Sequence, residues 1–370
     1  MATSVRVLVR RLHLWLGLGL GGLFALLGLT GSALVFYTGI DAALHPAVQV
    51  EREGPAPDWR SPVWDVVLAT AERSRHHPGG KWTFEVTGEV TGEGGAIPAR
   101  YYPAPGHHAD REMIWFSADG ARIVRAEPWG GYLMSWLYQL HMELLAGEIG
   151  HQIVGWSGMA MLVLLVTGLW AWWPRGEWRK ALAFKRRAAP IRRLRDLHKL
   201  SGLWSMALLF VLVATGVLLA LPAVTRAVFA PAAVPAPRPT VTGAGRIPIA
   251  RALAVAQQAL PGGRLTFFDV PSATDTPLRM RFQVPGDPHP RFPGSFMFVD
   301  QGTGHVLAVH DIRRGGTGTM LAGWIRTLHD GTIGGMTTRI LALALGLVPA
   351  MLFATGVLHW LRRRQAHARP

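Results

Sequence analysis

The chain contains no cysteine among its 370 residues, and only 16% of its residues are charged, whereas 49% are hydrophobic. The absence of cysteine excludes disulfides, thiolate metal sites, iron–sulfur clusters and haem attached covalently through cysteine, since each of these needs a sulfur atom. The shortage of charge excludes an ordinary soluble enzyme, in which about a quarter of the residues are charged. Fifteen histidines remain as candidate metal ligands.

Four stretches are apolar and long enough to cross a bilayer. Residues 12–36, 153–173, 200–221 and 340–361 each contain about 20 residues or more without an acidic side chain. At ~1.5 Å per residue such a helix spans the ~30 Å hydrocarbon core, so we predict four transmembrane helices. The first stretch is longer than the apolar run of about 7 to 15 residues found in a signal peptide, so we interpret it as an uncleaved anchor.

The net charge of +15 lies almost wholly beside the ends of these stretches. Seventeen basic residues flank them on one side, against only Glu177 and Asp196, and the remaining acids and bases balance. The flanking bases are Arg6, Arg10 and Arg11, ten Lys or Arg residues within 175–199, and Arg362, Arg363, Arg364 and Arg369. The positive-inside rule therefore predicts a bacterial inner-membrane protein with both termini cytoplasmic. A secondary contact with anionic membrane lipid is expected, and nucleic acid is excluded as a partner.

These patterns divide the chain into eight predicted segments. They are helix 1 at 1–38, a periplasmic domain at 39–148, helix 2 at 149–173, a basic cytoplasmic loop at 174–199, helix 3 at 200–222, a second periplasmic domain at 223–335, helix 4 at 336–361 and a cytoplasmic tail at 362–370. Each periplasmic segment has the size of a small domain.

The two periplasmic segments resemble each other. Each begins with a proline-rich stretch, at 54–57 and 231–239, and continues with a helical pattern, at 63–73 and 249–260. A related turn follows, Pro-Gly-Gly-Lys-Trp-Thr-Phe at 78–84 and Pro-Gly-Gly-Arg-Leu-Thr-Phe at 261–267. Hairpin patterns then surround Asp119-Gly120 and Gln301-Gly302. Each segment is therefore predicted to be a helix with a small antiparallel sheet.

The membrane stretches repeat as well. His13 and His198 begin the first and third stretches, and a Thr-Gly pair begins 17 residues later in both. His141 and His329 precede the second and fourth stretches, and a Thr-Gly pair begins 26 residues later in both. We therefore predict an α-helical membrane protein whose four-helix transmembrane bundle arose by internal duplication, with two α+β periplasmic domains and a pseudo-twofold axis along the membrane normal.

The repeat selects four histidines as ligands. A twofold axis would bring His13 and His198 to one depth at the cytoplasmic boundary, and His141 and His329 to one depth at the external boundary. Two imidazoles on opposite sides of one planar iron cofactor fit bis-histidine haem b, which needs no cysteine. We therefore predict two haem b groups, with His359 and His151 as reserve ligands at the inner and outer levels. The alternative interpretation is that these histidines cap helix ends at the interface.

Two haem levels predict a transmembrane electron conduit. The Thr-Gly pairs begin at Thr30, Thr167, Thr215 and Thr355, so each level receives two glycines from the opposite helix pair. These glycines would let a macrocycle approach a helix backbone, although small residues also pack membrane helices routinely. Electrons would enter from the cytoplasmic side and leave to an external acceptor.

The motifs also resemble a known family. The pattern Leu-His-x-x-x-Gly begins the first and third helices, Leu140-His141 precedes a helix ending in TGLWAWWPR, and TGVLHWLRRR ends the last one. Nearly the whole chain is similar to the PepSY-associated transmembrane family, iron-regulated membrane proteins with paired periplasmic PepSY units. The resemblance implies a ferric-siderophore reductase that uses b-type haems and releases Fe(II) in the periplasm. His13, His198, His141 and His329 match the family's motif histidines.

Several other expectations complete the sequence-based hypothesis. Trp136, Tyr132, Trp324 and Arg326 flank the outer histidines and are either substrate contacts or an interfacial aromatic belt. A Gly-x-Gly-x-x-Gly pattern at 17–22 lies inside a membrane stretch and is no dinucleotide loop, so the electron donor must be a separate cytoplasmic reductase, a soluble carrier or quinol. The competing hypotheses are a PepSY membrane scaffold or sensor without redox activity, and a reductase of another acceptor such as Cu(II). The remaining periplasmic histidines are expected at the surface: His76, His77, His107, His108, His289, His305 and His310.

Overall fold

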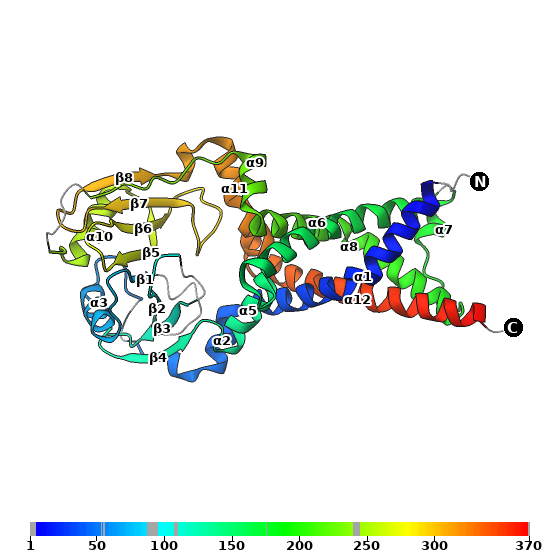
Figure 1. Cartoon of the computed structure of the whole chain (residues 1–370), viewed down its shortest axis with the longest axis horizontal. Helices are drawn as coiled ribbons and strands as arrows, with labels where there is room; N and C mark the ends of the chain where they lie inside the picture. The colour runs from blue at the N-terminus through cyan, green and yellow to red at the C-terminus, as the bar shows by residue number, and fades with distance from the viewer. Residues whose placement is uncertain are drawn as a thin grey trace. The chain divides into compact units, whose positions relative to one another are not determined.

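A computed structural model of the chain describes residues 5–52, 54, 56–86, 95–106, 110–174, 176–239 and 245–368. Of the residues singled out above, His107, His108, Arg369 and position 175 lie outside the described residues. The chain divides into two compact units (Figure 1). A helical unit comprises Met1–Val35, Tyr138–Val224 and Leu328–Pro370, and an outer unit comprises Phe36–Leu137 and Thr225–Thr327.

Four long helices form the helical unit. Within the described residues, four helices are long and apolar enough to cross a membrane, as the sequence predicts. They are α1 (Val5–Leu34), α6 (Gly147–Trp172), α8 (Pro190–Ala220) and α12 (Gly335–Ala368). A short helix, α7 (Trp178–Leu182), lies in the connection before α8. The protein is therefore a multi-pass membrane protein.

The four helices pack in a ring. Helix α1 contacts α6 and α12, and α8 contacts the same two helices, so α1 and α8 are diagonal partners. Small residues allow close approach at the α1–α12 contact, where a Cβ atom added to Gly28 would collide with the carbonyl oxygen of Gly346. The Ser32 hydroxyl donates to the Leu343 carbonyl across the same contact at 2.8 Å. Close packing and interhelical hydrogen bonds of this kind hold membrane helices together.

The outer unit is built on one antiparallel sheet. Within the described residues, eight strands lie in the order β4-β3-β2-β1-β5-β6-β7-β8. The strands are β1 (Lys81–Glu85), β2 (Ile97–Tyr102), β3 (Glu112–Phe116), β4 (Ile123–Pro128), β5 (Arg264–Pro271), β6 (Leu278–Gln283), β7 (Ser295–Val299) and β8 (Val306–His310). The helices that begin in or belong to this unit are α2 (Tyr37–Leu44), α3 (Val63–Ser74), α5 (Leu133–Glu143), α9 (Pro222–Phe229), α10 (Ile249–Ala259) and α11 (Gly316–His329).

The two outer segments form one sheet, whereas the sequence predicted two separate domains. Strand β1 of the first segment pairs antiparallel with β5 of the second, with Trp82 opposite Val270 and Phe84 opposite Phe268. This pairing satisfies backbone groups that two separate four-stranded sheets would leave open at their edges. The predicted helices at 63–73 and 249–260 and the two predicted hairpins are confirmed as α3, α10, β3–β4 and β7–β8.

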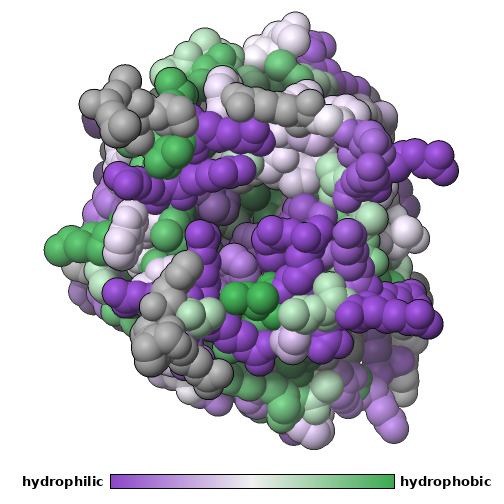
Figure 2. Space-filling model, turned by 90° about the vertical axis from the view of Figure 1, so that its right-hand side faces the viewer, coloured by the Kyte–Doolittle hydropathy of each residue, from purple (hydrophilic) through white to green (hydrophobic). Residues whose placement is uncertain are grey.

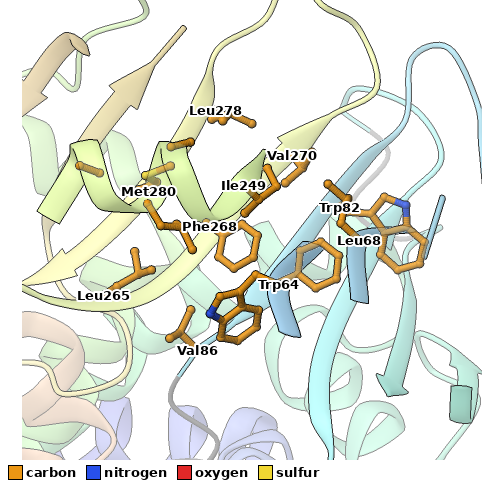
Figure 3. Close-up of a cluster of buried hydrophobic side chains, with 14 of the residues drawn as sticks. Trp64, Leu68, Trp82, Val86, Ile249, Leu265, Phe268, Val270, Leu278 and Met280 are labelled. Atoms are coloured by element: carbon orange, nitrogen blue, oxygen red, sulfur yellow. The ribbon is translucent and has the colours of Figure 1, made fainter. Parts of the chain in front are cut away.

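A single apolar core joins the two halves of the outer unit. Alternate strand residues point to α3 and α10, and the two helices share this core (Figure 3). The Trp64 ring of α3 lies edge-on to the Phe268 ring of β5 at 5.3 Å, and both side chains are almost fully buried. Each such side chain contributes roughly 1.5–3 kcal/mol to folding.

Candidate functional site

The histidines of the first predicted pair meet inside the helical unit. His13 lies on α1 and His198 on α8, the diagonal partners of the helical ring. Their ring centres are 6.3 Å apart, and the ring planes form an angle of 81°. We call His13 and His198 the inner pair. The repeat-based pairing is therefore present in the structure.

The second pair has the same separation. His141 lies on α5, and His329 is the last residue of α11. Their ring centres are also 6.3 Å apart, and the ring planes form an angle of 40°. We call them the outer pair. All four predicted ligands belong to the helical unit.

A separation of 6.3 Å matches two imidazoles on opposite sides of one metal ion. An imidazole nitrogen bonds a first-row transition metal at about 2 Å, and the ring centre lies about 1.1 Å behind that nitrogen. Two imidazoles bound to opposite sides of one ion therefore have ring centres roughly 6 Å apart. Neither pair has to move its backbone to reach that distance.

Every one of the four rings is held through Nδ1 by a leucine carbonyl of a neighbouring helix. Nδ1 of His13 donates to Leu164 at 3.1 Å, that of His198 to Leu352 at 3.0 Å, that of His141 to Leu27 at 3.0 Å and that of His329 to Leu212 at 2.9 Å. Because a carbonyl oxygen only accepts, each Nδ1 carries the hydrogen, and each Nε2 keeps its lone pair for a metal. This is the tautomer and support that metal-binding histidines need.

The same five-residue pattern provides all four supports. Each acceptor leucine lies three residues before the threonine of a Thr-Gly pair, giving Leu-x-x-Thr-Gly once in each long helix. The threonine oxygen also lies 3.1 to 3.4 Å from the same Nδ1. Its hydroxyl donates into its own helix, so the oxygen accepts a share of the imidazole N–H. The Thr-Gly pairs were predicted to be important, but the role of the leucine carbonyl was not. The signal in the sequence is the leucine three residues before each of the four Thr-Gly pairs.

The glycines of these pairs make room for the imidazoles. A Cβ atom added to Gly31, Gly168 or Gly216 would lie 2.9 Å from Cε1 of the histidine that its own helix supports, and one added to Gly356 would lie 3.4 Å away. The sequence left two interpretations open for these glycines, close approach of a macrocycle and ordinary helix packing. The structure places histidine rings over them, so these glycines let each imidazole reach the neighbouring backbone.

A cavity of about 840 Å³ surrounds the inner pair. This volume falls within the range of small-molecule and cofactor sites. Helix residues such as Leu18, Phe24 and Phe353 line it, and His359 joins His13 and His198 in its wall. Its basic lining residues are Arg10, Arg11, Arg195, Lys199 and Arg363. Hydrophilic side chains gather at the end of the helical unit that bears both chain termini (Figure 2).

The donor set around each pair suits a cofactor that brings its own equatorial ligands. Among the described residues, no group of three or more His, Cys, Asp or Glu side chains is placed to hold a metal ion. Two imidazoles alone do not complete a zinc site, which needs at least three protein ligands. A porphyrin iron needs only the two axial ligands, so the residues present fit haem b. His151, the outer reserve ligand, lies on α6 with a buried Nε2 that has no partner in the described part of the chain.

The aromatic residues near the outer pair have different environments. The Tyr132 hydroxyl is 2.6 Å from that of Tyr37, and its buried ring lies under the Arg125 guanidinium, so Tyr132 is part of the packing of the outer unit. Trp136 is 42% exposed. The Arg326 guanidinium lies 5.3 Å from the centre of the Phe292 ring.

The expected exposure of the histidines in the outer unit is wrong for two of them. His76, His77 and His305 are exposed as predicted, but His289 and His310 are buried. Nδ1 of His289 accepts from the backbone N–H groups of Arg291 and Phe292, so this ring organises the loop before β7. His310 ends β8 and packs 6.2 Å from the Phe296 ring.

Comparison with known proteins agrees with this architecture. No curated protein sequence matches the chain. The family described as the PepSY-associated TM region matches residues 10–363, a range that includes both histidine pairs, the whole of α6 and α8, and most of α1 and α12. Because the match covers almost the whole sequence, the chain belongs to the PepSY-associated transmembrane family.

Proposed function

We propose that the protein is a di-haem b electron-transfer protein of the bacterial inner membrane that reduces ferric siderophores in the periplasm. The observation that carries this proposal is the geometry of the two histidine pairs. Both have ring centres 6.3 Å apart, and all four Nδ1 atoms donate to leucine carbonyls. His13 and His198 would hold one haem, and His141 and His329 the other.

The two levels lie at opposite ends of the long helices. His13 and Thr30 are 17 residues apart on α1, and Thr30 lies beside His141, so the levels are roughly 25 Å apart along the helix. When bound, the haem irons supply reversible one-electron chemistry at both levels. The chain's own residues fix the tautomer of each ligand, exclude water with apolar helix faces and divide the membrane crossing into shorter steps.

The charge distribution supports a cytoplasmic side at the inner pair. Arg10, Arg11, Arg195, Lys199 and Arg363 line the inner cavity. Lysine and arginine concentrate on the cytoplasmic side of inner-membrane proteins. We therefore infer that both termini are cytoplasmic and that the outer unit is periplasmic. The equal histidine-to-threonine offsets in the two halves support our separate inference that the chain arose by internal duplication. The same basic rim suits the negatively charged propionates of haem and anionic membrane lipid.

The reaction needs no acid–base catalyst. One electron passes to Fe(III) in the chelate, which becomes Fe(II), and oxygen-rich chelators hold Fe(II) more weakly than the harder Fe(III). The iron is then released. The electron comes from a separate cytoplasmic reductase, a soluble carrier or quinol.

The test is reoxidation of the reduced full-length protein. We expect the purified protein to show a Soret band that shifts on dithionite addition. Mixing with ferric siderophores should return the oxidised spectrum and deliver iron to an Fe(II)-specific chelator. His141→Ala should abolish this transfer, whereas His305→Ala, an exposed histidine of the outer unit, should leave it unchanged.

Three results would overturn this assignment in different ways. A colourless, folded protein would favour a membrane scaffold or sensor. Reoxidation by Cu(II) salts but not by ferric siderophores would favour a copper reductase. A haem-containing protein that neither acceptor reoxidises would exclude both reductase activities.

A further inference from the structure

The sheet of the outer unit has a second face that does not point to α3 and α10. On β2 and β6 the residues that alternate with the core residues include three arginines. On β2, Arg100 lies between the core residues Ala99 and Tyr101. On β6, Arg279 and Arg281 alternate with the core residues Leu278, Met280 and Phe282. Successive strand residues point to opposite faces, so these arginines share the face opposite the helices.

Aromatic rings hold the arginine side chains on this face. The Arg281 and Arg279 guanidinium groups lie 4.7 and 5.4 Å from the centre of the Phe296 ring. The Arg100 guanidinium lies 5.0 Å from the Phe267 ring and 5.9 Å from that of Phe292.

A fourth arginine comes from α11. Arg326 lies 5.3 Å from the Phe292 ring, which itself stacks on Phe267 at 5.5 Å. We call Arg100, Arg279, Arg281 and Arg326 the arginine cluster. Stacking on a ring orients a guanidinium while leaving its edge N–H groups able to bind an anion.

Carboxylates compensate only part of this charge. Asp269 pairs with Arg279 at 2.8 Å and Lys81 at 3.2 Å. Glu85 binds Arg291 with both oxygens, at 2.7 and 2.9 Å, and lies 3.7 Å from Arg100.

Two members of the cluster form no ion pair among the described residues. In the described part of the chain, no carboxylate oxygen lies within salt-bridge distance of Arg281 or Arg326. Burial, followed by the positive charge of Arg279, lowers the pKa of Arg281 to about 10. The Asp269 carboxylate acts on the Arg281 pKa in the opposite direction, so the cluster keeps a positive charge that its carboxylates offset only in part.

We propose that the arginine cluster binds a polyanionic ferric chelate, one whose catecholate or carboxylate oxygens give the complex a net negative charge. This rests on the proposed reductase function and narrows its substrate class. An arginine guanidinium forms bidentate hydrogen bonds with a pair of anionic oxygens. Because these arginines are partly buried, their side chains are already ordered before the ligand binds. A neutral ferric hydroxamate gains little from such a site. In α11, Arg326 also comes three residues before the ligand His329.

The direct test is binding of redox-inert gallium(III) chelates to the full-length protein by calorimetry. We expect the gallium tris-catecholate complex to bind at least tenfold more tightly than a neutral gallium hydroxamate. Arg281→Gln and Arg326→Gln should each weaken catecholate binding roughly tenfold or more, since each removes a charge-assisted contact. Arg281→Lys, which keeps the charge but not the fork, should lie between wild type and Arg281→Gln.

Arg251→Gln is the matched control. Arg251 is exposed on α10, whose other face packs on the sheet, and the substitution removes the same charge from the same unit. It should leave binding unchanged. Thermal unfolding of each variant separates lost binding from lost folding, and Arg326→Gln tests the proposal if Arg281→Gln fails to fold.

Several results would contradict the proposal. Equal affinity for the anionic and neutral gallium complexes would exclude charge selection. Inorganic phosphate that competes as well as the chelate would show a general anion site only. Equal loss of binding in Arg251→Gln would show long-range charge attraction without a built site.

The gallium experiment tests the binding site independently of the proposed reductase function. Gallium(III) accepts no electron here, so its binding does not depend on haem. If the gallium catecholate binds but the iron catecholate does not reoxidise the reduced protein, the proposed reductase function is wrong and the proposed binding site stands. If ferric siderophores reoxidise the protein but both gallium chelates bind with equal affinity, the reductase function stands and the binding site is wrong.

Discussion

The inner and outer histidine pairs reach the same separation from different parts of the fold. The inner histidines lie within two long membrane helices, whereas the outer histidines lie on the shorter helices α5 and α11. Both pairs have ring centres 6.3 Å apart, but the ring planes form angles of 81° and 40°. The shared Leu-x-x-Thr-Gly contact accounts for the common distance. The helix that carries each histidine accounts for the different orientation.

The largest expected effect comes from filling the space under one ring. In Gly168→Val the new side chain would collide with His13, and in Gly31→Val with His141. We expect each variant to lose the haem of its own level and to keep the other. The haem content of the purified variants is the measurement.

A glycine elsewhere on α1 provides the control for this experiment. A Cβ atom at Gly19 would meet no atom within 4 Å, so Gly19→Val should keep both haems. Loss of both haems in Gly31→Val and Gly168→Val alike would show general misfolding of the bundle and would remove support for two independent levels.

A smaller effect should distinguish two glycines of the inner level. A Cβ atom at Gly356 would lie 3.4 Å from the His198 ring, an approach that a shift of a few tenths of an ångström relieves, but one at Gly168 would lie 2.9 Å from the His13 ring. We therefore expect Gly356→Ala to keep the inner haem and Gly168→Ala to hold it more weakly. Haem loss to apomyoglobin, followed by absorbance, measures the difference. Faster loss from Gly356→Ala would contradict this order.

The third prediction changes no residue. Crossed imidazole planes leave two d orbitals of low-spin ferric iron close in energy, and smaller angles separate them, so ligand orientation is visible in electron paramagnetic resonance. The inner pair should give a strongly anisotropic signal and the outer pair a rhombic one. His13→Ala should remove only the first. Two identical rhombic signals in the wild-type protein would show that the pairs do not differ in this way.

Much of this arrangement is predictable from the sequence because it depends on local patterns. Apolar length identifies the membrane helices, and the repeat isolates His13, His141, His198 and His329 from fifteen histidines. The spacing from histidine to threonine is the same in both halves, so the histidines occupy equivalent positions if the two halves fold alike. This argument uses no knowledge of tertiary contacts.

Other features depend on contacts that the local pattern does not contain. Strands β1 and β5 pair although they are far apart in the chain. In the sequence, each strand alone has the pattern of an edge strand in a small sheet, so their pairing was not predicted. The burial of His289 follows from a loop that folds around its ring, with two backbone N–H groups donating to it. The role of Gly31 depends on which group lies across from it, and sequence spacing alone allows either a ring or a macrocycle.

The most direct test of the account is the haem-to-protein ratio, measured by the pyridine haemochrome method on protein quantified by amino-acid analysis. We predict two haem b groups per chain in the wild type, one in His13→Ala, one in His141→Ala and none in the double variant. A wild-type ratio of one or less, or a ratio that either substitution leaves unchanged, would contradict the assignment of two bis-histidine sites.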